Sequence, residues 1–167
     1  MDNRISDNTY AIIYDYYMDE YVPGHFSTCI EGYPLTLDFF FTPSDHRLPY
    51  LAIKMNVALR TAKDRSDFET KVKQIAPENE TSIIMDSFFI IIEMTLEDNY
   101  EVALREMLDV LPKYLKDRNY NTGCARCGIK DEISLYQVEW GKAENVCPQC
   151  KADLCEDKEK QLERRAQ

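Results

Sequence analysis

Four of the six cysteines form two CxxC pairs, Cys124 with Cys127 and Cys147 with Cys150. A CxxC turn directs two thiolates toward one point, and two such turns together supply four sulfur ligands in a tetrahedron. In a reducing compartment, paired cysteines are more often metal ligands than disulfides. We therefore predict a metal site at these four cysteines.

Zinc is the metal we expect, with one ion per chain. Four protein thiolates leave no open position for water, so the zinc would be structural and we expect no catalytic residue. Iron in the same cage would make an electron carrier, but such carriers consist of little besides the metal site. Two disulfides or a thioredoxin-like dithiol are further alternatives, although the βαβ pattern that surrounds a thioredoxin motif is missing.

The two cysteine pairs stand in sequence contexts known from small metal-binding modules. The first reads CxxCG over Cys124–Gly128 and the second reads CPxC over Cys147–Cys150, with a strand-like segment at Ile133–Gly141 between them. This arrangement resembles the zinc-ribbon class, in which a hairpin lies between two cysteine knuckles. The same halves also resemble rubredoxin, which holds iron.

We expect no chemistry from the two remaining cysteines or from the two histidines. Cys155 could replace a ligand, but the CxxC spacing gives the other four cysteines priority. Cys29 lies in a predicted strand, where we expect a small buried thiol. A Cys29 nucleophile with His25 is disfavoured, because strand residues four apart are separated by ~13 Å. His46 is interpreted as a solvated turn residue.

Alternating apolar residues predict the strands that precede the cysteines. Such alternation places one set of side chains on each face of a strand. It occurs at Leu51–Leu59 and at Leu35–Phe41, and more briefly at Phe26–Ile30, which together predict a three-stranded meander. Two more strands are expected within Ser82–Leu96, with a turn at Asp86–Ser87.

Helical spacing of apolar residues predicts three helices. One follows Asn8 as a cap, one follows a capping box at Ser66–Glu69 and ends before Pro77, and one follows a capping box at Asp98–Glu101. Pro112 lies inside the last helix, where it should cause a kink.

The predicted order is helix, three strands, helix, two strands, helix, which gives an α+β fold with an antiparallel sheet. Over roughly residues 8–118 this order resembles the type III secretion chaperone-like fold. That resemblance implies a small acidic protein that dimerises and binds extended segments of partner proteins. We divide the chain into a sheet domain at 1–120, a zinc ribbon at 121–155 and a charged tail at 156–167.

Composition narrows the function classes. The chain carries a formal net charge of −10 and shows neither a secretory signal pattern nor a membrane-length apolar run, so we expect a cytoplasmic protein without membrane insertion. Our first hypothesis is a non-enzymatic protein-binding module, chaperone-like or adaptor-like, with a homodimer as one expected form. A nucleic-acid-binding regulator acting through the ribbon is the alternative, but the basic stripe that phosphate contact needs is largely cancelled by acidic neighbours.

Overall fold

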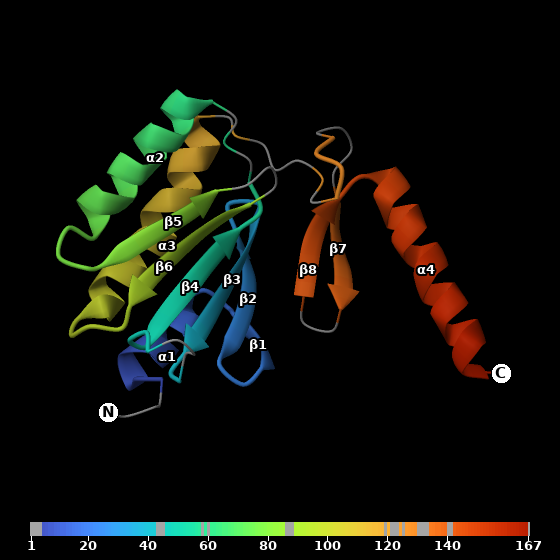
Figure 1. The fold of residues 1–167 in the computed structure, drawn as a ribbon, viewed down its shortest axis with the longest axis horizontal. Helices are drawn as coiled ribbons and strands as arrows, with labels where there is room; N and C mark the ends of the chain where they lie inside the picture. The colour runs from blue at the N-terminus through green and yellow to red at the C-terminus, as the bar shows by residue number, and fades with distance from the viewer. Residues whose placement is uncertain are drawn as a thin grey trace.

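The computed structural model describes residues 5–42, 46–57, 59, 61–85, 89–118, 120, 124, 126–129, 134–139 and 142–166 (Figure 1). Within them lie, in chain order, α1 (Asp7–Asp15), β1 (Asp19–Val22), β2 (His25–Ile30), β3 (Tyr33–Phe40), β4 (Tyr50–Met55), α2 (Ala62–Ile75), β5 (Thr81–Met85), β6 (Ile90–Thr95), α3 (Tyr100–Asp117), β7 (Ser134–Glu139), β8 (Lys142–Val146) and α4 (Pro148–Ala166). None of the helices in these residues is both long enough and apolar enough to cross a membrane.

Six of the strands form one antiparallel sheet with the order β1-β2-β3-β4-β6-β5. The predicted meander is confirmed as β2, β3 and β4, and the α+β class with an antiparallel sheet is confirmed as well. The register aligns Leu37 with Phe26 on one side and with Ile53 on the other, and Ile53 with Ile92. These four side chains therefore form one apolar row on a single face of the sheet.

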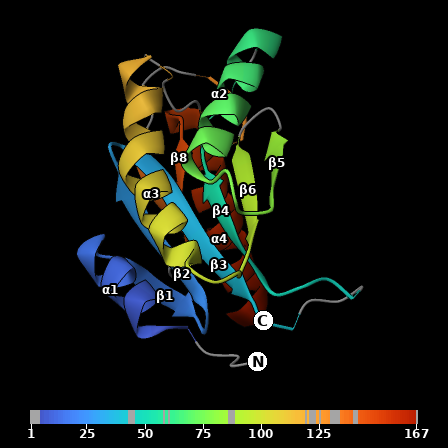
Figure 2. The ribbon, with the colours of Figure 1, turned by 90° about the vertical axis from the view of Figure 1, so that its left-hand side faces the viewer.

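Helices α1, α2 and α3 cover that apolar face (Figure 2). Phe68 of α2 and Leu104 of α3 are fully buried against it, at the helical spacing seen in the sequence. Strand β4 ends at Met55, four residues earlier than the alternation suggested, but Val57 and Leu59 are still buried in the same core. The alternation therefore predicted burial correctly and the end of the strand incorrectly.

The predicted element order is wrong at one point, because an additional strand, β1, lies between α1 and β2. It pairs with β2 through Asp19 opposite Ser27 and Glu20 opposite Phe26. As an edge strand that is largely exposed, it needs no apolar alternation, so no apolar pattern predicts it. The order before residue 118 is therefore helix, four strands, helix, two strands, helix.

Two of the predicted helix caps are wrong, because other residues cap these helices in the structure. The cap of α1 is Ser6, whose hydroxyl accepts a hydrogen bond from the Thr9 N–H, and not Asn8. The cap of α2 is Thr61, which accepts from the Asp64 N–H, so Ser66 lies inside the helix. Short polar residues are frequent in both regions, and each can cap a helix.

The capping box predicted before α3 is also wrong. The cap residue is Asn99, with a left-handed φ of 66°, and its side chain makes no capping hydrogen bond in the described residues. Glu101 instead accepts a hydrogen bond from the Ser6 hydroxyl at 2.7 Å. This bond, together with that between Thr9 and Tyr100 at 2.6 Å, joins α1 to α3.

The C-terminal elements lie on the other side of the sheet from α2 and α3 (Figures 1 and 2). Strands β7 and β8 form an antiparallel hairpin, and β8 contacts β3. Helix α4 runs without a break across residue 155, the predicted boundary between the ribbon and the charged tail. The predicted turn at Asp86–Ser87 lies outside the described residues, as do Asn119 and residues 121–123 of the expected domain boundary.

Candidate metal centre

A tight loop positions the first cysteine pair. The Cys124 N–H donates to the Ile129 carbonyl at 2.8 Å, and the Gly128 N–H donates back to the Cys124 carbonyl at 2.9 Å. Gly128 has a φ of +80°, a conformation that a residue without Cβ adopts at little cost. The glycine of the CxxCG pattern therefore lets the chain turn back immediately after Cys127.

The start of α4 positions the second pair. Cys147 follows β8 directly, and Cys150 lies in the first turn of the helix. The Lys151 N–H donates to the Cys147 carbonyl at 2.9 Å, and the Cys150 N–H approaches the Cys147 sulfur at 3.4 Å. Pro148 suits the first helical position because it has no N–H to leave unpaired there.

The four predicted cysteines come together in a single cluster. Their sulfur atoms all lie within 4.8 Å of one another, and the Sγ atoms of Cys127 and Cys147 are 3.6 Å apart. In a tetrahedral cage with metal–sulfur bonds of about 2.3 Å, the sulfurs would be separated by about 3.8 Å. The cysteines are therefore arranged to hold a metal ion, and the donor set fits zinc or iron.

The cluster is buried on one side and open on the other. Cys124 and Cys147 are buried in a small core with Val146, against which Tyr136 and Leu154 pack. Cys150 is partly buried and Cys127 is exposed. Each pair thus supplies one buried sulfur, from Cys124 or Cys147, and one more exposed sulfur, from Cys127 or Cys150.

The surroundings of the sulfurs favour one thiolate even without a metal. Burial raises the pKa of Cys124, but backbone N–H groups of Cys147, Cys127 and Arg126 donate toward its sulfur and lower that pKa to about 6. Burial and the adjacent thiols raise the pKa of Cys150. A metal ion would supply the positive charge needed for all four sulfurs to lose their protons.

The other candidate residues lie outside this cluster. Cys155 is on α4 with its sulfur 3.5 Å from the Tyr136 hydroxyl. Cys29 is exposed, so the prediction of a buried thiol is wrong: its side chain projects from the sheet face opposite the helices. His25 bonds Asp38 through Nδ1 at 2.8 Å, and His46 is exposed in a turn, as predicted.

Sequence reasoning missed the contribution of Tyr136 to this region. Its ring packs on the small core, and its hydroxyl accepts a hydrogen bond from the Lys158 ammonium at 3.2 Å. Lys158 also lies over the ring, 4.8 Å from its centroid. The available signal was the position of Tyr136 in an alternating strand-like segment, which says nothing about a partner on α4.

Comparisons with protein-family profiles, with curated proteins and with solved structures give no match for this chain. The interpretation of the site therefore rests on its own geometry.

Proposed function

We propose that this chain is a non-enzymatic protein-binding module, chaperone-like or adaptor-like, whose C-terminal part is a structural zinc ribbon. The zinc-ribbon part of the proposal rests on the cluster of four cysteine sulfurs within 4.8 Å. The β7–β8 hairpin between the two pairs supports the ribbon assignment. The four residues that would hold the zinc are Cys124, Cys127, Cys147 and Cys150.

A structural role follows from the number and type of ligands. Four thiolates complete the tetrahedral shell that zinc prefers, so the ion would bring no open position for substrate. Zinc would instead tie the loop at Cys124 to the start of α4 through Cys150. The core beside it contains few apolar residues, so the metal would provide most of the cohesion of this part of the chain.

The binding role is supported by the two edges of the large sheet. Edge strand β1 begins with Asp19 and Glu20, and charges at an edge discourage the addition of another strand. The opposite edge, β5, reads TSIIM, and Ile84 within it is 48% exposed. An uncharged edge strand with an exposed apolar side chain is suited to pairing with an extended segment of a partner protein.

A capture experiment with a matched control tests the binding role. The tagged wild type, Ile84→Lys and Tyr14→Lys would each be used to capture proteins from a lysate of the native host. Tyr14 is a suitable control because it is also exposed and apolar but lies on α1, away from β5. We expect the wild type and Tyr14→Lys to retain the same partner and Ile84→Lys to lose it. Equal retention by all three proteins, or equal loss from both variants, would contradict the assignment to β5.

A further inference from the structure

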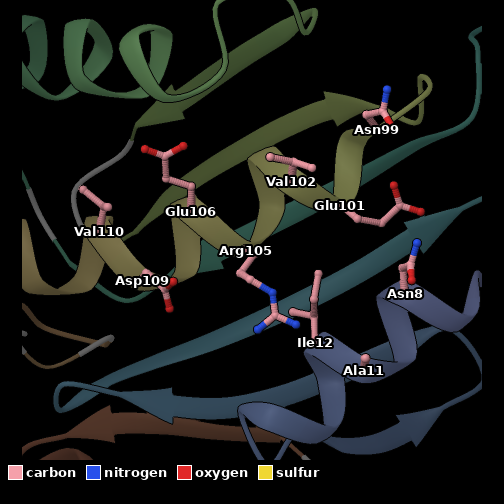
Figure 3. A pocket seen from close by; sticks show the side chains of 10 residues that line it. All are labelled: Asn8, Ala11, Ile12, Asn99, Glu101, Val102, Arg105, Glu106, Asp109 and Val110. Atoms are coloured by element: carbon pink, nitrogen blue, oxygen red, sulfur yellow. The ribbon is translucent and has the colours of Figure 1, made fainter.

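A hollow of about 490 Å³ between α1 and α3 gathers charged side chains but no nucleophile (Figure 3). Its only lining cation, Arg105, extends from α3 toward α1 and is paired with Asp15 at 2.9 Å. The residues that line it include no cysteine, histidine, serine or lysine. The metal centre, by contrast, brings four thiols together.

The four sulfurs of the metal centre differ in their access to solvent. Cys124 and Cys147 are 0% and 3% exposed, whereas Cys127 is exposed and Cys150 is partly buried. Thiolate character and exposure together determine which cysteine an oxidant attacks first. All four ligands of a zinc ion are thiolates, so exposure is what distinguishes them. Cys127 is therefore the sulfur most open to a dissolved oxidant.

The exposed sulfur of Cys127 has a buried sulfur directly beside it. The Sγ atoms of Cys127 and Cys147 are 3.6 Å apart, slightly less than the separation of about 3.8 Å in a regular zinc–thiolate tetrahedron. These two residues belong to different CxxC pairs. A disulfide between them requires the sulfurs to approach to about 2.0 Å. An oxidised Cys127 therefore has a second thiolate in position to react with it.

We propose that the metal centre is a redox switch, in which hydrogen peroxide converts Cys127 and Cys147 to a disulfide and the metal is released. This inference rests on the zinc ribbon proposed above and adds the regulation of that same site. The Cys127 thiolate first attacks a peroxide oxygen, so that an S–O bond forms, the O–O bond breaks and hydroxide leaves. The Cys147 thiolate then attacks the sulfur of the resulting sulfenic acid, so that the S–S bond forms, the S–O bond breaks and a second hydroxide leaves.

The two steps transfer two electrons from the sulfurs to the peroxide. The peroxide is reduced to two hydroxide ions, which take up protons from the buffer to form water. The chain then offers only two of its four thiolates, those of Cys124 and Cys150, which are too few to hold a structural zinc ion. Oxidation of one pair of sulfurs is thus sufficient to empty the site.

The disulfide would join the same two segments that the metal joins. It connects the loop at Cys124–Gly128 with Cys147, which directly precedes α4, and so closes the chain around the β7–β8 hairpin. The four cysteines therefore stay near one another after the metal has left. A thiol reductant that supplies two electrons breaks the S–S bond and restores both ligands, which makes the switch reversible.

Peroxide titration of the full chain, purified with its metal, tests the switch. Released zinc would be measured with a chromogenic chelator, and disulfides would be mapped by mass spectrometry after alkylation of the free thiols. We expect release of the zinc with Cys127–Cys147 as the first disulfide, and full recovery of the metal content with dithiothreitol and added zinc. Cys29→Ser/Cys155→Ser removes only the cysteines outside the cluster and should respond as the wild type does.

Two histidine variants test whether Cys127 is the sulfur that reacts first. Cys127→His and Cys150→His each keep three thiolates and add an imidazole, a donor set that also holds zinc. Only the first variant removes the exposed sulfur, so the rate of zinc release should fall at least about tenfold in Cys127→His and change little in Cys150→His. The disulfide map of the wild type decides the question even where a histidine variant fails to retain zinc.

Several outcomes would overturn the proposal. They are a first disulfide within one CxxC pair, release from Cys127→His as fast as from the wild type, slower release from Cys29→Ser/Cys155→Ser, and oxidation that dithiothreitol does not reverse. A wild type that holds zinc but resists peroxide would overturn the switch and leave the zinc ribbon intact. A wild type without metal would contradict the ribbon, and the disulfide map would still test the reaction of Cys127 with Cys147.

Discussion

Replacing Cys147 with serine should unfold the C-terminal unit and leave the sheet domain folded. Cys147 is only 3% exposed and lies in the small core beside the other three cysteines. Serine keeps the size of the side chain but is a poor ligand for zinc, so the substitution removes one of four metal bonds. The expected consequence is a chain that no longer retains the metal.

The expected loss of stability in the C-terminal unit can be worked out from the few contacts that would remain without the metal. Structural zinc contributes about 10–16 kcal/mol to the folding of finger-sized units. Full burial of a large apolar side chain contributes about 1.5–3 kcal/mol, and this core offers three such side chains, Val146, Tyr136 and Leu154, of which two are only partly buried. Ordering each residue costs about 1–2 kcal/mol of backbone entropy. Without the metal, the apolar contacts cannot offset that cost.

The sheet domain should survive because it has a core of its own. Its buried cluster extends from Ile12 to Leu115 and contains none of the cysteines. Amide hydrogen exchange measures both parts in one experiment: protection should be lost in β7 and β8 and kept in β3 and β4. Cys29→Ser serves as the control, since Cys29 is exposed and lies outside the cluster.

Two results would refute this reasoning. Protected amides in β7 and β8 of a metal-free Cys147→Ser chain would show that the hairpin folds without the metal. Loss of protection in β3 and β4 as well would show that the two cores unfold as one unit, despite their separation in the structure.

Three further predictions concern the metal site and the core. Cys155→Ser should keep the metal content of the wild type and Cys150→Ser should lose it, as measured by elemental analysis; equal loss would make Cys155 a ligand. Protons compete with the metal for the thiolates, and because the pKa of Cys150 is raised while that of Cys124 is lowered, Cys150 should be the first ligand to regain its proton as the pH falls. Metal retention that does not decrease with falling pH in a chelator titration would contradict this competition. Phe68→Ala should lower the free energy of unfolding of the sheet domain by about 3–5 kcal/mol in a denaturant titration without changing the metal content, because Phe68 is fully buried in the larger core. A change below about 1 kcal/mol would show that the core collapses around the smaller side chain.

The candidate site could be predicted because its geometry is local. A CxxC pair is a turn in which four residues determine where both sulfurs point, so the spacing alone identified Cys124, Cys127, Cys147 and Cys150. The surroundings of the site could not be predicted in the same way. The contact of Tyr136 with α4 depends on how the hairpin meets the helix, which no local pattern specifies.

The central strands could be predicted because burial of one face imposes alternation. Leu35 and Leu37 face the helices while Thr36 and Asp38 do not, and β4 repeats the pattern. Strand β1 escaped prediction for the same reason, since an exposed edge strand needs no apolar face. Burial of one face thus produces the apolar alternation that predicts a strand, and strands that bury little show no such alternation.

Helix caps were harder to place because several residues in a row satisfied the same rule. Ser66 begins a sequence that fits a capping box, yet Thr61 caps α2, and the turn of helix between them contains only polar residues and one alanine. At α3, Glu101 accepts a hydrogen bond from Ser6, which is distant in the sequence, and does not complete a capping box at its own helix. A tertiary contact that no local pattern specifies, between Ser6 and Glu101, therefore links the observed beginnings of α1 and α3.

The most direct test of the structural zinc is the metal content of the chain purified without chelator. Elemental analysis should give one zinc per chain for the wild type and none for Cys124→Ser. A coloured protein containing iron, or a wild type with almost no metal, would contradict the assignment.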